Sequence, residues 1–193
     1  MANRLFKPMG GSLTQDVVLL TGKWSIVTDA TCDLTSGAAT VTMDSTTSIK
    51  VGMLVDDTGG ATKVPDGTTV VSVDSATQFT MSANATGAAT NATLQFVETT
   101  GVKGFSVGVV NDDSEQELTL DDTYNDLVGV SLTYEGAFHA DKSTVFDIAE
   151  ETVSTDKVIK VRHIKVENGT AQAETNLNGK TIRCMIWLKN SSV

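Results

Sequence analysis

Proline, cysteine and histidine are almost missing from this sequence, with only two of each among 193 residues. Two prolines, Pro8 and Pro65, do not make a polyproline linker or stalk. Cys32 and Cys184 do not make a disulfide framework, nor a zinc site, which needs four ligands. We expect both cysteines to be small buried side chains, and we expect no metal ion and no cofactor.

Long apolar runs and aromatic residues are also scarce. No stretch approaches the ~18–20 apolar residues of a membrane-spanning helix, and the apolar run 17–20 is too short for a secretory signal. We therefore expect synthesis in a cytoplasm and no contact with a membrane. Aromatic residues make up 5% of the chain, which disfavours an exposed carbohydrate-binding face, so Trp24 and Trp187 are predicted to be buried core residues.

Positively charged residues are also few. The chain has 14 Lys and Arg and 24 Asp and Glu, which gives a formal net charge of −10 at pH 7. Phosphate backbones repel such a chain, so no binding to nucleic acid is expected. Many carboxylates gather in residues 111–126, and oxygen ligands at that density suit Ca²⁺. The residue order of an EF-hand is missing, however, so a solvated hairpin tip is the preferred interpretation and Ca²⁺ binding stays open.

What the sequence has in plenty is threonine and valine, its two commonest residue types, together with 16 glycines. Residues branched at Cβ lose rotamer freedom in helices and pack well on a pleated sheet, so the chain is predicted to be all-β with little helix. One short helical turn is expected at residues 121–127, capped by Asp121 and Asp122. Strands are expected at residues 17–27, 39–43, 49–55, 68–73, 78–81, 93–97, 102–110, 117–120, 127–134, 157–166 and 180–188.

Changes in composition along the chain predict its organisation. Residues 30–99 are rich in Thr, Ala, Ser, Gly and Asp and predict a small β-sandwich module. Residues 17–29 and 100–193 predict a discontinuous host domain, a β-sandwich or barrel-like fold, into which the module is inserted. Residues 1–16 show little apolar pattern and predict an extended N-terminal arm that needs another surface to pack against.

One motif, Gly-Phe-Ser-Val-Gly at residues 104–108, matches the G-x-S-x-G pattern of hydrolases. That chemistry needs a strand before the serine, a helix after it, and Asp and His downstream. Here Val109 and Val110 continue a strand and alternating β-α units are absent, so a plain strand is predicted and Ser106 is not expected to be a nucleophile. His139 and His163 are interpreted as ordinary surface or hydrogen-bonded residues.

A basic segment, residues 157–165, stands out within the acidic chain because it holds Lys157, Lys160, Arg162, His163 and Lys165. Charges on both faces of a strand are typical of a sheet edge that is protected against aggregation. The same charges also suit an acidic patch on a neighbouring subunit. Both interpretations stay open at this point.

Several segments resemble structural proteins of tailed phages. Within residues 51–96, the segments VGM, PDGTTVVSV, TMSANAT and LQF are similar to a β-module that recurs in such proteins, and the match covers about a third of the chain. The rest is similar to small virion proteins of short-tailed phages. The matching segments there are MANRLFKPMGGSL at the start, GVKGFS, LDDTYNDLVGV, and NSSV at the end.

The resemblance implies a non-enzymatic virion protein, made in a host cytoplasm and located on the capsid surface as a decoration or cement protein. Its implied partner is the major capsid protein, and it is expected to be a homo-oligomer, with a trimer suited to the three-fold positions of a shell. The family has no catalytic residues to carry over. A tail, neck or head-fibre component, and a module that binds host-surface glycans, remain alternatives.

We expect the contact with the shell or with a neighbouring subunit to involve the arm, because it is apolar and basic within an acidic chain. The basic segment 157–165 is the second candidate. The residues predicted for this interface are Asn3, Arg4, Leu5, Phe6, Lys7, Met9, Lys160, Arg162 and Lys165.

Overall fold

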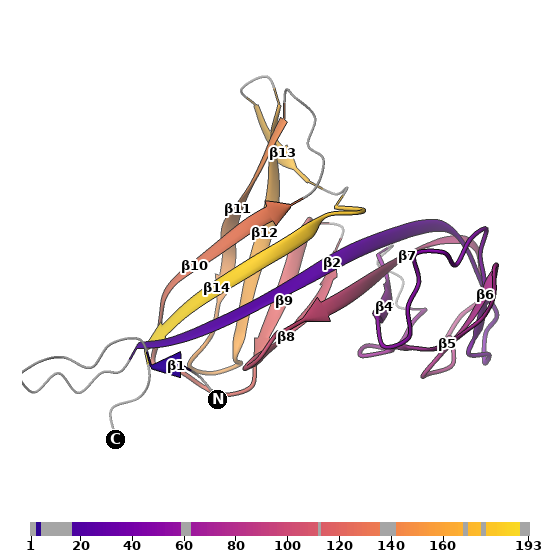
Figure 1. The fold of residues 1–193 in the computed structure, drawn as a ribbon, viewed down its shortest axis with the longest axis horizontal. Helices are drawn as coiled ribbons and strands as arrows, with labels where there is room; N and C mark the ends of the chain where they lie inside the picture. Colours follow the sequence, from indigo (N-terminus) through magenta and orange to yellow (C-terminus); the bar gives the residue numbers. More distant parts are fainter. Residues whose placement is uncertain are drawn as a thin grey trace, which may run out of the picture.

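The computed structural model describes residues 3–4, 17–58, 63–111, 113–135, 142–167, 170–174 and 177–189. These described residues are all-β, with 0% helix and 64% in strands that form two antiparallel sheets (Figure 1). The predicted fold class, all-β with little helix, is therefore confirmed. The helical turn expected at residues 121–127 is wrong: residues 121–125 hold only bends and unassigned residues, and a strand begins at Asp126.

The first sheet has nine strands and the second has five. The main path of the first is β10 (Asp126–Glu135), β14 (Thr181–Lys189), β2 (Val17–Leu34), β3 (Thr40–Thr42), β6 (Gln78–Met81) and β5 (Val70–Ser75). Off this path, β1 (Asn3–Arg4) and β7 (Ala89–Thr100) pair with β2, and β4 (Leu54–Asp57) pairs with β7. The second sheet has the order β11 (Lys142–Glu151), β12 (Val158–Glu167), β9 (Glu115–Leu120) and β8 (Phe105–Val110), with β13 (Thr170–Ala173) on β12.

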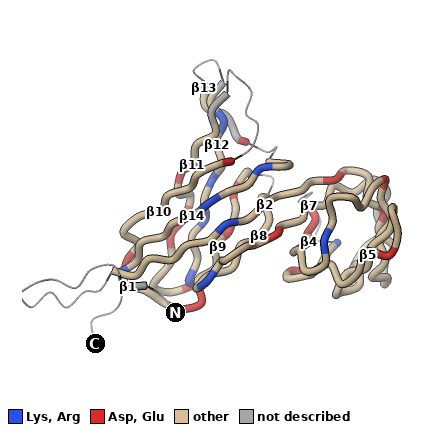
Figure 2. Tube along the Cα trace, in the orientation of Figure 1, with Lys and Arg blue, Asp and Glu red and all other residues tan. Residues whose placement is uncertain are grey.

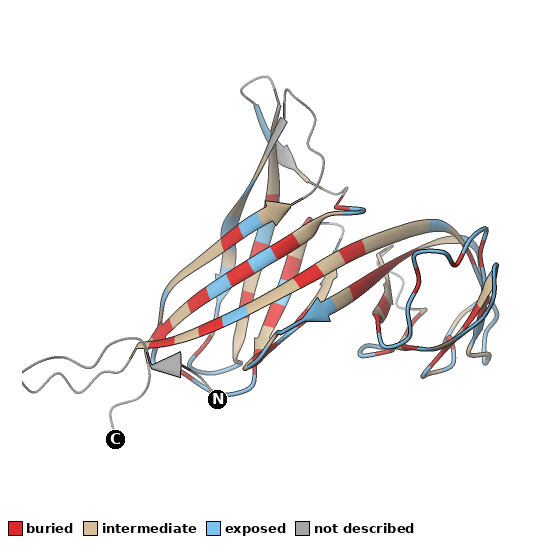
Figure 3. Cartoon of the chain, viewed as in Figure 1, coloured by how far each residue is buried: buried red, intermediate tan, exposed pale blue. Residues whose placement is uncertain are grey.

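Strands β10, β14 and β2 of the first sheet lie across the second sheet and enclose the larger hydrophobic core (Figure 1). Side chains alternate between inside and outside along each strand, which gives the banded pattern of burial in Figure 3. In β14 the buried residues are Ile182, Cys184, Ile186 and Leu188, as the alternation predicted. In β2 the predicted inward residues are likewise buried: Val18, Leu20, Trp24 and Ile26.

A second, smaller core lies beyond this sandwich. Strands β2 and β7 continue as a paired ribbon into a second part of the chain, which we call the distal unit (Figure 1). It comprises the described residues between 35 and 88 together with the ends of β2 and β7 that pack against them. Its core contains Phe79 and Phe96, which meet edge to face with ring centroids 5.4 Å apart. The buried members of the two cores are different residues, so each core is a separate hydrophobic cluster.

Some strand boundaries differ from the prediction, and non-local pairing explains the differences. Strand β2 was expected to end near residue 27 but continues to Leu34, because β7 pairs with its polar part through two irregularities between Asp29 and Leu34. Strand β11 was not predicted at all. Its sequence, KSTVFDIAEE, has only short apolar stretches, and it forms a strand by pairing with β12 along its whole length.

Gly22 of β2 packs tightly against Val102 and Phe105. A Cβ atom at this position would lie 2.7 Å from Val102 Cγ2 and 2.9 Å from Phe105 Cζ. We therefore expect Gly22→Ala to lower the free energy of unfolding by about 1–3 kcal/mol through overpacking, measured by urea denaturation. The matched control is Gly87→Ala, where the nearest atom is Lys63 Cγ at 3.4 Å and little change is expected. Equal stability of the two variants would contradict this packing.

Candidate interaction surfaces

The predicted arm is placed by the structure only at Asn3 and Arg4, which form β1 against the start of β2. Asn3 pairs with Leu19 and Arg4 with Val18, while Leu5, Phe6, Lys7 and Met9 lie outside the described residues. The distal unit is attached at the opposite end of β2 (Figure 1). At about 3.3 Å per residue, the path along β2 between these two ends is roughly 50 Å.

Apart from Lys157, which precedes it, the basic segment belongs to β12, which is an inner strand. It lies between β11 on one side and β9 and β13 on the other. The interpretation of this segment as a protected sheet edge is therefore wrong. Its charges have a different cause: alternate residues of β12 face outward from the sandwich, while Ile159, Val161 and His163 face the core and are buried.

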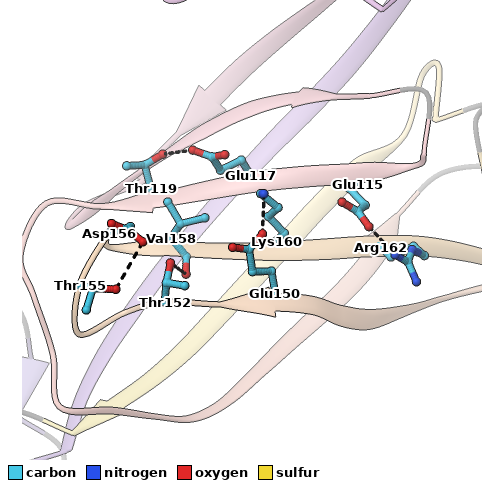
Figure 4. A network of polar contacts seen from close by, with 10 residues as sticks. All are labelled: Glu115, Glu117, Thr119, Glu150, Thr152, Thr155, Asp156, Val158, Lys160 and Arg162. Carbon is cyan, nitrogen blue, oxygen red and sulfur yellow. Dashed lines mark hydrogen bonds and ion pairs between the residues drawn. The ribbon is translucent and has the colours of Figure 1, made fainter. Parts of the chain in front are cut away.

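The outward charges of β12 meet carboxylates on the neighbouring strands of the same sheet (Figure 4). Figure 2 marks the positions of Lys and Arg in blue and of Asp and Glu in red along the chain. Lys160 Nζ lies 2.5 Å from Glu150 Oε2 on β11, and the Arg162 guanidinium is paired with Glu115 on β9. The hydrogen bond and charge of Glu150 raise the pKa of Lys160. Lys165 is half-buried and lies between Thr144 of β11 and Gln172 of β13 in the ladder. Two of the three predicted contact residues of β12 are thus neutralised within the chain.

A groove of about 480 Å³ runs beside this charged face, between the second sheet and the distal unit. Leu54, Asp56 and Asp66 line it from the distal unit, and Ser106, Glu115 and Glu117 line it from β8 and β9. Partial burial raises the pKa of Asp56. This groove was not predicted, because its lining comes from segments about 50 residues apart that come together only in the fold.

The acidic stretch 111–126 includes the turn between β8 and β9, strand β9 itself, and the connection to β10, which begins at Asp126. Asn111 Oδ1 accepts hydrogen bonds from the backbone N–H groups of Asp113 and Glu115, at 3.0 and 2.9 Å, and so closes the turn between β8 and β9. The Glu115 carboxylate forms an ion pair with the Arg162 guanidinium. In the part of the chain that the structure describes, no three His, Cys, Asp or Glu side chains converge as ligands of a metal ion.

Ser106, the centre of the G-x-S-x-G motif, lies exposed in β8 with its Oγ 3.5 Å from the carbonyl oxygen of Thr119. The strand interpretation of this motif is confirmed, since β8 covers residues 105–110 and β9 follows it. His163 is fully buried in the sandwich, where its ring contacts Tyr134 and Gln116. His139 lies outside the described residues.

The tryptophans and cysteines follow the prediction except at one position. Trp24 is fully buried, and Cys32 and Cys184 are buried free thiols. Burial raises the pKa of Cys184 to about 12. Trp187 is only half-buried, which corrects the prediction of a core residue: it lies on the outer face of β14, opposite Leu19 of β2, while Ile186 and Leu188 take the inward positions.

The described residues contain no helix with the length and apolar character needed to cross a membrane.

Comparison with known proteins found no similar protein. No protein-family model matches the chain, and no curated protein or solved structure matches it either.

Proposed function

We propose that this protein is a structural component of a phage virion, a head decoration or cement protein that binds the outer capsid shell and stabilises it. The sequence resemblance of the N-terminal segment, of LDDTYNDLVGV and of the module within residues 51–96 gives the class. The main structural observation in support of this proposal is that β1 and the distal unit lie at opposite ends of β2. An arm at one end is suited to hold the shell while the distal unit projects from it.

The proposed mechanism is mechanical. Packaged DNA pushes the shell outward, and a protein that bridges neighbouring capsomers adds contact area that opposes their separation. An interface of about 1,600 Å² gives useful affinity, and several copies joined in a homo-oligomer add avidity. A trimer on the three-fold positions of the shell is the proposed form, with the major capsid protein as partner.

The test is the number of copies in purified particles, measured by quantitative mass spectrometry against the major capsid protein. Hundreds of copies in a fixed ratio would support decoration of the head. A dozen or fewer would place the protein in the tail, the neck or a head fibre instead. Absence from mature particles would overturn every virion role. Binding of residues 30–99 to a glycan array would favour the glycan-binding alternative.

We also expect β12 to contribute little to attachment. Because Lys160 and Arg162 are paired with Glu150 and Glu115, the double variant Lys160→Gln/Arg162→Gln should bind shells as the unchanged chain does. Its stability should change little, since exposed ion pairs contribute little. Co-sedimentation with shells that lack the protein measures this, and Lys165→Gln serves as the companion variant. Loss of binding in the double variant alone would make β12 the contact.

A further inference from the structure

A chain of four polar side chains crosses the inside of the sandwich and joins its two sheets. Trp24 of β2 and Tyr134 of β10 come from the first sheet, and Gln116 of β9 and His163 of β12 come from the second. Trp24, Gln116 and His163 are each 0% exposed. Trp24 Nε1 lies 3.1 Å from Gln116 Oε1, which is 3.2 Å from His163 Nε2, and His163 Nδ1 lies 2.8 Å from the Tyr134 hydroxyl.

The donors and acceptors of this chain fix the tautomer of neutral His163. An indole N–H only donates, so the Gln116 atom it meets is the carbonyl oxygen, and the Gln116 amide donates to Gly108 O at 2.7 Å. Because Gln116 Oε1 accepts, His163 Nε2 must carry a hydrogen. The unprotonated Nδ1 then accepts a hydrogen bond from the Tyr134 hydroxyl. With His163 neutral in this tautomer, the Trp24 N–H, the His163 Nε2–H and the Tyr134 hydroxyl each donate to a partner within 3.2 Å.

A second proton on His163 would disturb this arrangement. It would place an N–H at Nδ1, so the Tyr134 hydroxyl hydrogen would have to turn to the Val145 carbonyl oxygen of β11, which lies at 3.4 Å. Tyr134 and Val145 belong to β10 and β11, which end the two sheet orders. The proton therefore acts where the outermost strands of the two sheets meet.

The surroundings of His163 offer little to balance a positive charge. Cys184 of β14 is a buried thiol whose pKa is raised by burial. The Glu174 backbone N–H donates to the His163 carbonyl oxygen. Burial raises the pKa of Tyr134, and the Cys184 thiol and the Glu174 carboxylate add to this rise. On β9 and within β12, Glu115 and Arg162 are paired with each other on the outer face. Burial alone lowers the pKa of His163, to about 4.

We propose that Trp24, Gln116, His163 and Tyr134 form a pH-sensitive latch that holds the two sheets together while His163 is neutral and weakens the β10–β11 side of the sandwich when His163 takes up a proton. The latch depends on the fold alone and holds whether or not the protein is a virion component.

The direction in which stability changes with pH follows from the pKa of His163 in the folded and unfolded chain. An unfolded histidine binds its proton near pH 6.5, whereas the folded one does so near pH 4. Between these values the unfolded chain binds more protons, so stability is complete above about pH 6.5 and falls as the pH drops towards 4. At pH 4 the unfolding equilibrium constant should have risen by roughly 100-fold through this residue.

The test compares urea unfolding of the full chain and its variants between pH 7 and pH 4. His163→Asn keeps an acceptor for Tyr134 but does not titrate, so it should be less stable at pH 7 and should lack the roughly 100-fold acid-dependent component. Carboxylates titrate in both proteins and cancel in the comparison. His139→Asn, which changes the other histidine of the chain, should keep the unaltered profile. The same profile in His163→Asn, or its loss in His139→Asn, would overturn the assignment.

Two further measurements do not depend on whether His163→Asn folds. Imidazole ¹⁵N spectra of His139→Asn, in which His163 is the remaining histidine, should show the Nε2–H tautomer at pH 7 and no titration near pH 6.5, and the opposite result would overturn the latch. In Tyr134→Phe the hydroxyl oxygen that would accept from the protonated Nδ1–H is gone. Because a hydrogen bond to the charged ring is stronger than one to the neutral ring, the pKa of His163 should fall further and the acid-dependent loss should continue to a lower pH. Hydrogen exchange at pH 4.5 should accelerate in β10 and β11 before β2 and β7, and uniform acceleration would contradict a local release.

Discussion

Deleting residues 1–11 is expected to abolish attachment to capsid shells and to leave a folded chain. Of these residues, the structure places only Asn3 and Arg4 in a strand. Each pairs with one residue near the start of β2. The sandwich core begins after the deletion, at Val18, so far-ultraviolet circular dichroism and the urea midpoint should change little. The fraction that sediments with shells lacking the protein should fall to background, because the predicted contact residues of the arm are gone.

Point variants separate the chemistry of the arm from its length. Leu5→Ser/Phe6→Ser removes apolar area, and Arg4→Gln/Lys7→Gln removes charge, while both keep all residues of the arm. If the contact is mainly apolar, the first variant should lose most binding even at high salt. If it is mainly electrostatic, the second should lose it, and binding of the unchanged chain should weaken as salt rises. Retained attachment of the deletion variant would place the contact elsewhere, with Lys160, Arg162 and Lys165 of β12 next to be tested.

The sequence predicted the strands whose own residues alternate. Strand β14 is the clearest case, since TIRCMIWLK places each second residue inward and the structure buries all four of them. Turn signals worked in the same local way, and β6 was predicted with its correct bounds. These features depend on neighbours along the chain, so one sequence is enough to predict them.

Features that depend on distant partners were beyond the sequence. The charges of β12 look the same whether the strand lies at an edge or in the middle, because only the pairing with β11 and β9 decides. The role of Gln116 is hidden for the same reason: it becomes the centre of a buried polar chain only when Trp24 and His163 reach it from other strands. The position of His163 in a predicted strand did not indicate that its ring would join this polar chain.

The second large effect is expected in the distal unit. Phe79 is fully buried against Phe96 in the smaller core, and Phe79→Ala should lower the free energy of unfolding of that unit by about 3–5 kcal/mol. Both tryptophans of the chain, Trp24 and Trp187, lie on strands of the sandwich, so tryptophan fluorescence reports the sandwich alone. Circular dichroism reports strands of both parts. In Phe79→Ala the dichroism transition should therefore begin at lower urea while the fluorescence transition stays in place.

A matched substitution in the larger core gives the opposite pattern. Leu118 is fully buried between the two sheets, and Leu118→Ala should cost about 2–5 kcal/mol and move the fluorescence transition. The two variants together ask whether the β2–β7 ribbon transmits unfolding from one core to the other. If Phe79→Ala shifts both probes equally, the chain unfolds as one cooperative unit and the inserted-module organisation is contradicted. If only dichroism shifts, the distal unit can open while the sandwich stays intact, as a projecting part of a shell-bound protein requires.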